Sequence, residues 1–264
     1  MKKILLCPPT FYDIEYEINP WMHLENKVDK EKVTEEYRQL WAAYESLGAK
    51  VLEINPVKGL PDMVYAANLG FPLGNKFALS NFRYPQRREE AKYAKAFFEK
   101  SGFDIVTLPD GVYFEGQGDL LTTNGKYFLG WGKRSSRQAK DVLSRKLGIK
   151  FIDFELIDPY FYHLDMSLGP LNKETVLMKP ESFTQEGMAK IKKEFKNVIE
   201  VTKEDNEFMA CNLVVVDKSV VIGQGISGKL KKNIEECGFK VVQVPMGEYR
   251  KGGGSIKCLT LEFY

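Results

Sequence analysis

The stretch FALSN (77–81), PQRREEAKYAKAFFEKSG (85–102), FDIVTLP (103–109) decides the fold of this chain. It predicts an apolar strand, an amphipathic helix, a glycine-bearing turn and a second apolar strand, in that order. Within the helix, Ala94, Phe97 and Phe98 lie at helical spacing on one face. A unit of this kind cannot bury that face alone, and it therefore needs neighbours of the same kind.

The same order of elements recurs four more times. The repeats are KKILLCPP (2–9) with the helix 32–48, YFLGW (127–131) with the helix 135–148, TVLMKP (175–180) with the helix 184–195, and SVVIGQ (219–224) with the helix 226–238. Their closing strands are centred near residues 53, 106, 153, 200 and 242. Five such units favour a closed α/β ring in one domain, 1–264, with repeats near 1–55, 60–109, 112–156, 162–202 and 207–264.

The composition excludes several classes of protein. Of 264 residues, 44% are hydrophobic and 28% charged, which excludes wholesale disorder, collagen and coiled coil. A net charge of +2 gives no footprint for nucleic acid or an anionic membrane, and no apolar run is long enough to span a bilayer. The four cysteines form no CxxC pair, so we expect a reduced, cytoplasmic protein with no metal site and no cofactor.

Polar residues interrupt the apolar pattern after each closing strand. The interruptions are LPDMVYAANLG (60–70), VYFEGQGDLL (112–121), YHLDMSLG (162–169), EFMACNLVV (207–215) and KGGGSIKCLTLEF (251–263). In a closed ring, equivalent positions converge on one axis. We therefore expect one axial cavity, with the helices outside and the loop Asn19–Met22 at its border. The residues expected to line it are Asn68, Glu115, His163, Asp165 and Cys258.

Each of these residues also has a structural explanation. A histidine beside the aromatic residues 160–162 is commonly a hydrogen-bonded core residue, and a cysteine before an apolar run is commonly a small buried hydrophobe. Turn and capping positions account singly for Asp62, Asn68, Glu115 and Asp119. Their recurrence in equivalent positions favours function. A cysteine, a histidine and a carboxylate together predict covalent catalysis, and Gly252–Gly254 permit a close backbone approach before Cys258.

Five segments together resemble the guanidino-group modifying enzymes, the amidinotransferase or pentein superfamily. They are CPPTFYDIEYEINPWM (7–22), LPDMVYAANLG, FEGQGD (114–119), YHLDMSL and GGGSIKCLTL (252–261). Members include arginine deiminase, dimethylarginine dimethylaminohydrolase, glycine amidinotransferase and bacterial arginine dihydrolase. The resemblance runs from Leu5 to Leu261 and implies a pentein fold, five ββαβ units in a pseudo-fivefold α/β propeller.

The resemblance also implies roles for individual residues. Cys258 would attack the guanidinium carbon and form a thiouronium-type intermediate, while His163 would protonate the departing amine and then activate water. Glu115 and Asp165 would bind guanidinium nitrogens. Arg83, and Arg134 at the start of a predicted helix, match arginines that clamp the substrate α-carboxylate. Asp62 and Asn19 complete the expected substrate-binding set.

The resemblance also distinguishes between members of the superfamily. Asn68 stands where deiminases and dimethylarginine hydrolases have aspartate, and with Asn19 it resembles arginine dihydrolase, which converts arginine to ornithine, two ammonia and carbon dioxide. A carboxamide both donates and accepts hydrogen bonds, so it could hold a neutral ureido group. Dimethylarginine hydrolase, deiminase and amidinotransferase remain alternatives, as does a noncatalytic binding module. We expect arginine or a methylated arginine as substrate, and a homo-oligomer is possible.

Overall fold

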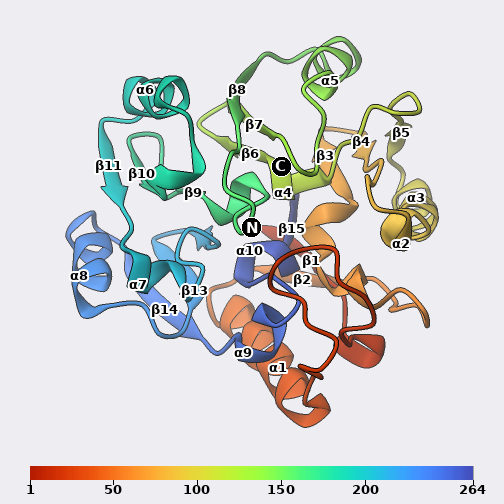
Figure 1. Cartoon of the computed structure of the whole chain (residues 1–264), viewed down its shortest axis with the longest axis horizontal. Coiled ribbons are helices and arrows are strands. Elements are labelled where there is room, and N and C mark those ends of the chain that lie inside the picture. The colour runs from red at the N-terminus through yellow and green to blue at the C-terminus, as the bar shows by residue number, and fades with distance from the viewer. Residues whose placement is uncertain (264) are drawn as a thin grey trace.

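The computed structural model describes residues 1–263, and its strands form five three-stranded sheets around one axis (Figure 1). In sheet order these are β3–β4–β5, β6–β7–β8, β9–β10–β11, β12–β13–β14 and β15–β1–β2. The arrangement confirms the predicted pentein propeller.

The fifteen strands of the described residues are short. They are β1 (Lys3–Leu6), β2 (Lys50–Glu53), β3 (Gly70–Leu73), β4 (Lys76–Leu79), β5 (Asp104–Val106), β6 (Leu120–Thr123), β7 (Lys126–Trp131), β8 (Phe151–Glu155), β9 (Leu168–Pro170), β10 (Thr175–Met178), β11 (Asn197–Glu200), β12 (Val214–Val216), β13 (Ser219–Gly223), β14 (Lys240–Val244) and β15 (Leu261–Phe263). The closing strands β2, β5, β8, β11 and β14 lie at or close to the predicted positions.

The helices are of two kinds. The long ones are α1 (Lys30–Ser46), α3 (Glu90–Lys100), α5 (Ala139–Leu147), α6 (Gln185–Glu194) and α8 (Gly228–Glu236). The short ones are α2 (Pro85–Arg88), α4 (Gly116–Asp119), α7 (Lys203–Asn206), α9 (Gly247–Arg250), α10 (Ile256–Leu259), η1 (Pro9–Phe11), η2 (Pro61–Val64), η3 (Ala66–Leu69), η4 (Leu164–Met166) and η5 (Pro180–Ser182).

Strand pairing explains why the long helices lie outside. In the sheet β3–β4–β5, the central strand β4 pairs antiparallel with β3 and parallel with β5. A parallel pair needs a crossover connection, which α3 provides. The ring of Phe98 in α3 stacks on Phe77 in β4 at 3.6 Å between centroids, so the apolar helix face is buried on the sheet. The long helix of each unit lies at the periphery (Figure 1).

Two boundaries differ from the sequence-based expectation. Strand β15 pairs antiparallel with β1, with Lys3 opposite Phe263, so the predicted repeat 207–264 is divided between two sheets. The ends of the chain thereby close the ring (Figure 1). The helix predicted at 135–148 begins only at Ala139, so Arg134 lies in the loop after β7 and not at a helix start.

Short helical turns carry the polar motifs to the axis. Turn η3 runs directly into β3, α4 into β6, and α10 comes just before β15. At Gly116 in α4, φ is +58° and a Cβ would lie 2.5 Å from the carbonyl oxygen of Ala67. Glycine is therefore required where the motifs of two repeats pack against each other.

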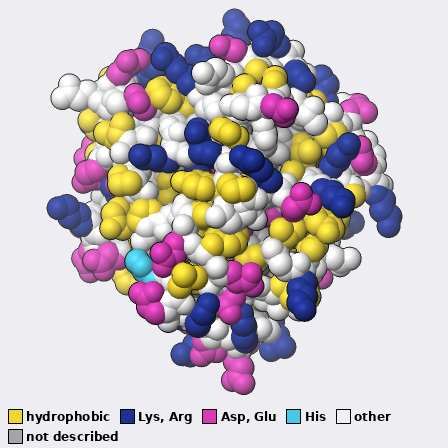
Figure 2. Space-filling model, turned by 45° about the vertical axis from the view of Figure 1, so that its right-hand side comes forward, with side chains coloured by type: hydrophobic (Ala, Val, Ile, Leu, Met, Phe, Trp, Pro, Cys, Tyr) yellow, Lys and Arg dark blue, Asp and Glu magenta, His cyan; other side chains and the backbone are white. Residues whose placement is uncertain are grey.

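The surface carries mixed charge. On the face shown in Figure 2, Lys and Arg side chains are interspersed with Asp and Glu. Within residues 1–263, no helix is both long and apolar enough to span a membrane.

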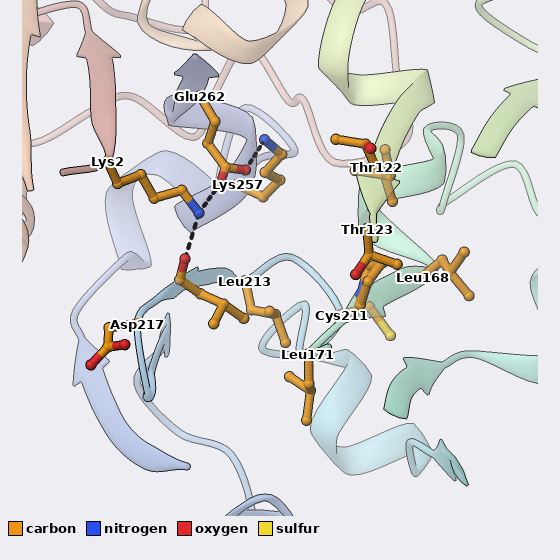
Figure 3. Close-up of a pocket in the computed structure, with 13 residues that line it drawn as sticks. Lys2, Thr122, Thr123, Leu168, Leu171, Cys211, Leu213, Asp217, Lys257 and Glu262 are labelled. Carbon is orange, nitrogen blue, oxygen red and sulfur yellow. Dashed lines mark hydrogen bonds and ion pairs between the residues drawn. The ribbon is translucent and has the colours of Figure 1, made fainter. Parts of the chain in front are cut away.

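A cavity of about 300 Å³ lies among the inner strands (Figure 3). We call it the inner-strand cavity, and its lining includes residues of β6, β9, β12 and β15, together with Lys2 and Lys257. The ammonium groups of Lys2 and Lys257 both contact the carboxylate of Glu262, the second at 2.5 Å. Burial opposes ionisation of Glu262, but the two lysines outweigh it and lower its pKa to about 2.

Glu262→Gln should lower the free energy of unfolding by about 3–5 kcal/mol, because it leaves the buried Lys257 ammonium without its anion. The folded pKa of Glu262 lies below its unfolded value, so its stabilisation is present above about pH 4.5 and is lost as the pH falls toward 2. Urea unfolding at several pH values measures both effects. Glu35→Gln on exposed α1 is the control and should leave stability unchanged. Equal stability of Glu262→Gln and the parent at neutral pH would contradict the prediction.

Candidate active site

Cys258 lies in α10, which follows the glycine run Gly252–Gly254. Its side chain is buried, and its Sγ donates to Oδ2 of Asp165 at 3.3 Å and accepts from Nδ2 of Asn212 at 3.1 Å. Burial first, and then the negative charge of Asp165, raise the pKa of the Cys258 thiol well above its usual value. Both effects favour the neutral thiol of Cys258 over its thiolate in the free protein. A Cβ at Gly254 would lie 2.4 Å from the Tyr65 ring and 3.1 Å from Cβ of Cys258, which explains glycine there.

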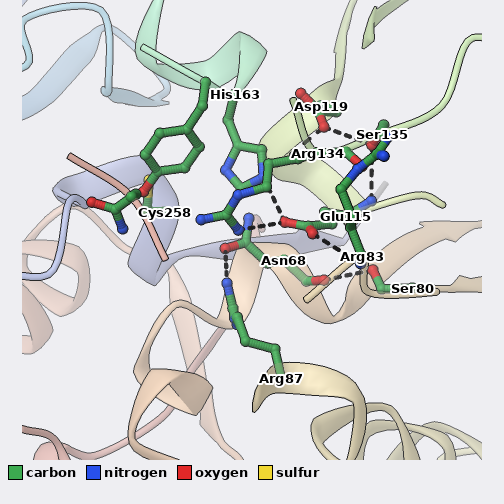
Figure 4. Close-up of polar contacts among 12 residues, drawn as sticks. Asn68, Ser80, Arg83, Arg87, Glu115, Asp119, Arg134, Ser135, His163 and Cys258 are labelled. Carbon is green, nitrogen blue, oxygen red and sulfur yellow. Dashed lines mark hydrogen bonds and ion pairs between the residues drawn. The ribbon is translucent and has the colours of Figure 1, made fainter. Parts of the chain in front are cut away.

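His163 and Glu115 form a buried pair (Figure 4). Nε2 of His163 lies 2.8 Å from Oε2 of Glu115, and Nη1 of Arg134 donates to the same oxygen at 2.8 Å. The other oxygen, Oε1, accepts from the backbone N–H of Arg83 at 3.3 Å. Burial raises the pKa of Glu115, but Arg134 and His163 outweigh it and hold that pKa far below its usual range. Glu115 is thus an anion that faces His163 and Arg134.

A second carboxylate, that of Asp119, lies close to His163. Oδ2 of Asp119 accepts from the Ser135 hydroxyl at 2.6 Å and lies 3.9 Å from Nε2 of His163. Oδ1 accepts from the backbone N–H of Leu164 at 3.1 Å, which fixes the turn η4 that follows His163. Burial raises the pKa of Asp119 to about 6. Across residues 1–263, no group of His, Cys, Asp or Glu side chains has the arrangement of a metal site.

Asn68 lies between Arg87 and His163. Nη1 of Arg87 donates to Oδ1 of Asn68 at 2.9 Å, whereas Nδ2 of Asn68 is buried and has no hydrogen-bond partner within the described chain. A Cβ at Gly118 would lie 2.3 Å from this Nδ2 and 3.0 Å from Nδ1 of His163. The amide nitrogen of Asn68 and the imidazole of His163 therefore both pack against Gly118.

Two further carboxylates, those of Asp62 and Asp165, have buried oxygen atoms without a hydrogen-bond partner among residues 1–263. Both carboxylate oxygens of Asp62 are buried without a hydrogen-bond partner among residues 1–263, and the nearest cation is Nε of Arg87 at 3.8 Å. Oδ1 of Asp165 is likewise unpartnered in this part of the chain. Burial raises the pKa of Asp165 to about 7. Buried carboxylates with unmet acceptors are suited to receive a cationic group.

A cavity of about 310 Å³ borders the segment 17–20 and is linked to Glu115 through Arg134; we call it the loop-side cavity. Its lining comprises Glu17, Ile18, Asn19, Pro20, Tyr84, Lys133, Arg134, Pro159 and Tyr162. Arg134 lies between the rings of Tyr84 and Tyr162, at 4.9 and 4.4 Å from their centroids. Nδ2 of Asn19 donates to the carbonyl of Gly252 at 3.0 Å, so the loop Asn19–Met22 is fastened to the glycine run.

Arg83 and Arg87 lie in different places. Arg83 donates through Nε to the carbonyl of Arg134 at 2.9 Å, and its guanidinium stacks on Tyr113. Arg87 is fully buried, contacts Asn68, and makes two bonds of 2.8 Å to Glu90. The resemblance predicts a role for Arg83, whereas Arg87 is the arginine of this run whose side chain contacts Asn68. The run NFRYPQRR offers three arginines, and only burial distinguishes them.

Asn212 is likewise absent from the set of residues that the sequence predicts for the site. Its segment, EFMACNLVV, is the fourth polar interruption, but no residue in it is among the expected site residues. The signal was present, because Asn212 occupies the one interruption that contributed nothing to the expected site. In the structure Asn212 contacts Cys258 directly.

Gly118→Ala should abolish most activity while the protein still folds, because the added methyl would overlap Nδ2 of Asn68 and press on His163. We expect kcat/KM to fall by about 100-fold or more, since small displacements of reacting groups have effects of this size. The matched control is Gly228→Ala at the start of α8, where a Cβ meets nothing within 4 Å. Steady-state kinetics and thermal unfolding of both variants test this. Full activity in Gly118→Ala would mean that Asn68 and His163 do not act beside this glycine.

A ring of five sheets with a cysteine, a histidine and buried carboxylates near its axis defines the guanidino-group modifying, or pentein, superfamily. More specifically, a protein-family model described as eukaryotic N,N dimethylarginine dimethylhydrolase matches residues 13–264, and the chain belongs to this family.

Two curated relatives represent two activities. The bifunctional arginine dihydrolase/ornithine cyclodeaminase ArgZ of Synechocystis sp. is 37% identical over 98% of this chain and 37% of its own length. The N(G),N(G)-dimethylarginine dimethylaminohydrolase of Mycobacterium tuberculosis is 34% identical over 100% of this chain and 86% of its own. The present chain thus spans little more than a third of ArgZ.

Solved structures of relatives have the same fold as this chain. The N-terminal domain of ArgZ bound to product superposes with a TM-score of 0.96 at 36% identity, covering 100% of this chain and 97% of that one. The same domain has been solved covalently bound to a reaction intermediate, with a TM-score of 0.96 at 35% identity over 100% and 98% of the two chains. Dimethylarginine dimethylaminohydrolase of Pseudomonas aeruginosa shares the fold, with a TM-score of 0.83 at 20% identity over 99% of each chain.

Proposed function

We propose that this protein is a cysteine-dependent arginine dihydrolase that converts arginine to ornithine, two ammonia and carbon dioxide. The observation that carries the proposal is the buried, unpartnered Nδ2 of Asn68 beside His163. A carboxylate at this position could only accept hydrogen bonds, whereas the amide offers a donor to the oxygen of a neutral ureido group. The likeness to ArgZ over 98% of the chain supports the same assignment.

The first half-reaction begins with binding of the guanidinium cation. The open oxygen of Asp165 accepts a guanidinium N–H, and Asp62 accepts from another cationic group of the substrate. The arriving positive charge neutralises the effect of Asp165 on Cys258 and favours the thiolate. His163 takes up the proton of the Cys258 thiol, and the thiolate then attacks the guanidinium carbon and forms a tetrahedral adduct.

Collapse of the adduct needs a proton for the departing amine. His163 supplies it, because its ring is buried beside Glu115 and an imidazole is the side chain best suited to general acid–base catalysis. Glu115 stays ionised and bonds to Nε2, so it orients the imidazole and stabilises its protonated form. Water activated by His163 then attacks the carbon of the thiouronium-type intermediate. The thiolate of Cys258 departs, and the ureido product is formed.

The second hydrolysis repeats these steps on bound citrulline. The ureido group is neutral, so carboxylates hold it less well than they hold guanidinium. Nδ2 of Asn68 donates to its oxygen, and Arg87 fixes the amide in that orientation by holding Oδ1. Asn19 is bonded to Gly252 and to Trp21, and we assign it to anchoring the loop over the site. Arg134 lines the loop-side cavity and is the arginine available to the substrate α-carboxylate.

Dimethylarginine hydrolysis is the second candidate, because the matching family model and the mycobacterial relative carry that description. Mass spectrometry of products from arginine, citrulline and dimethylarginine, supplied separately, distinguishes the two. The dihydrolase yields ornithine from arginine with little free citrulline. Release of dimethylamine faster than arginine is consumed would replace the proposal with the second candidate.

We further propose a reducing, cytoplasmic location. The nucleophile must remain a thiol, and Cys7, Cys211, Cys237 and Cys258 are all free.

A further inference from the structure

Asn212 uses the full hydrogen-bonding capacity of its carboxamide at the nucleophile. Its side chain is completely buried. Oδ1 accepts from the backbone N–H groups of Lys257 at 2.9 Å and Cys258 at 3.1 Å. Nδ2 donates to Sγ of Cys258 at 3.1 Å and to the carbonyl of Asp165 at 3.3 Å. One amide therefore joins the fourth polar motif to the segments that carry Asp165 and Cys258.

These bonds fix which end of the amide faces the sulfur. If the amide turned over, Oδ1 would lose both backbone N–H donors, and Nδ2 would face those donors without an acceptor. The arrangement that satisfies the backbone is therefore the one that points an N–H at Cys258. The backbone contacts make this donor a permanent feature of the site, present before any substrate binds.

The surroundings of the sulfur need such a donor. Asp165 faces Sγ with negative charge, and burial removes water, so both disfavour the thiolate. The hydrogen bond from Asn212 acts in the opposite direction. The cation of the substrate favours the thiolate only while it is bound in the charged form, and it is absent when the neutral ureido group is attacked. In that second step the N–H of Asn212 still donates to the sulfur, and it acts together with the backbone hydrogen bond at Ser255.

The location of Asn212 also allows a purely structural role, and the test must distinguish that role from stabilisation of the thiolate. Cys211 and Lys257, which precede Asn212 and Cys258 in the chain, line the inner-strand cavity (Figure 3). The segments of Asn212 and Cys258 therefore border that cavity through these neighbours, and the Asn212 amide joins the two segments. If Asn212 only held these two segments together, its loss would change the access of reagents to Cys258 but not the pKa of the thiol. We call this structural role the clasp.

We propose that Asn212 is a catalytic residue, which donates a hydrogen bond to the Cys258 thiolate and stabilises it for both attacks. This deepens the proposed function and rests on its covalent chemistry. Asn212 has no role in selecting the substrate, because its four bonds go to the nucleophile segment and to backbone.

The test is the pH dependence of alkylation of Cys258 by iodoacetamide in the substrate-free protein. Peptide mass spectrometry separates Cys258 from the other three cysteines. In Asn212→Asp a carboxylate oxygen keeps the backbone contacts, and the other faces the sulfur in place of the N–H. The midpoint of the alkylation profile should rise by about one pH unit or more, equivalent to about tenfold slower reaction below the midpoint. With arginine, kcat should fall by at least about tenfold with KM within about threefold.

Asn233→Asp is the matched control, since it makes the same chemical change on the outer helix α8 and should leave the profile unchanged. A change in the plateau rate with an unchanged midpoint would show an altered access path, and this would overturn the proposal in favour of the clasp. An unchanged profile would overturn it as well. If Asn212→Asp does not accumulate as folded protein, Asn212→Ala, which has no side-chain hydrogen-bond donor, gives the same readout.

Alkylation uses no substrate, so the outcome is independent of which guanidino compound is hydrolysed. A shifted midpoint together with no ornithine from arginine would leave the role of Asn212 at the thiolate intact and refute only the dihydrolase assignment.

Discussion

Cys258→Ser should fold normally and lose turnover by about 10⁵-fold or more, the scale of loss when a covalent nucleophile is removed. A serine hydroxyl is far harder to ionise than a thiol. It would stand in the same buried position beside Asp165, where even the thiol pKa is raised. Substrate binding should survive, because the carboxylates Asp62 and Asp165 and the arginines Arg87 and Arg134 are untouched. Single-turnover kinetics and calorimetric binding of arginine measure the two halves of this prediction.

The remaining cysteines provide the control. Cys237 lies at the end of α8 on the outside of the ring, so Cys237→Ser should retain parental kcat and KM. Cys7 packs in the hydrophobic cluster around Phe77, and Cys211 lines the inner-strand cavity, whereas Sγ of Cys258 contacts Asp165; neither Cys7 nor Cys211 is therefore expected to be the nucleophile. Measurable multiple turnover in Cys258→Ser would remove Cys258 from the mechanism. A covalent adduct on any other cysteine in the parent protein would have the same consequence.

The fold could be predicted because its signal is local and repeated. Each unit carries its own strand, helix and closing strand, and the apolar face of each helix is visible in the sequence, as at Ala94 and Phe98. Closure through β15 and β1 could not be located in the same way. That pairing joins residues at opposite ends of the chain, and its antiparallel register has no local pattern that differs from an ordinary edge strand.

Some residues of the candidate site could be predicted from the sequence, and others could not. Cys258, His163 and Asp165 belong to motifs whose residue types suggest chemistry directly, and the structure brings Cys258 and Asp165 into contact. Arg87 was missed because three arginines lie close together in the chain, and charge alone does not reveal which one is buried against Asn68. Asn212 was missed because a carboxamide has no distinctive chemistry until its partners are known.

Asn68→Asp should convert the enzyme from an ornithine producer into a citrulline producer. Arg87 donates to Oδ1 of Asn68 at 2.9 Å, and an aspartate would keep this contact as an ion pair, so the fold should be retained. The change falls on the other atom: the unpartnered N–H donor beside His163 becomes a carboxylate oxygen. Guanidinium gains an acceptor from this exchange, and the neutral ureido oxygen loses its donor and meets a negative charge instead.

The loss of that hydrogen bond should slow the second hydrolysis more than the first. Leaving a buried ureido oxygen unsatisfied costs about 1–3 kcal/mol, which corresponds to roughly 5- to 150-fold in rate. A time course of ornithine and citrulline from arginine, followed by mass spectrometry, should show citrulline accumulating in Asn68→Asp and not in the parent or in Asn233→Asp. Citrulline supplied directly isolates the second step, because no guanidinium is then present. If Asn68→Asp hydrolyses citrulline as fast as the parent does, Asn68 does not hold the ureido group, and the continuation to ornithine must depend on other residues around Cys258.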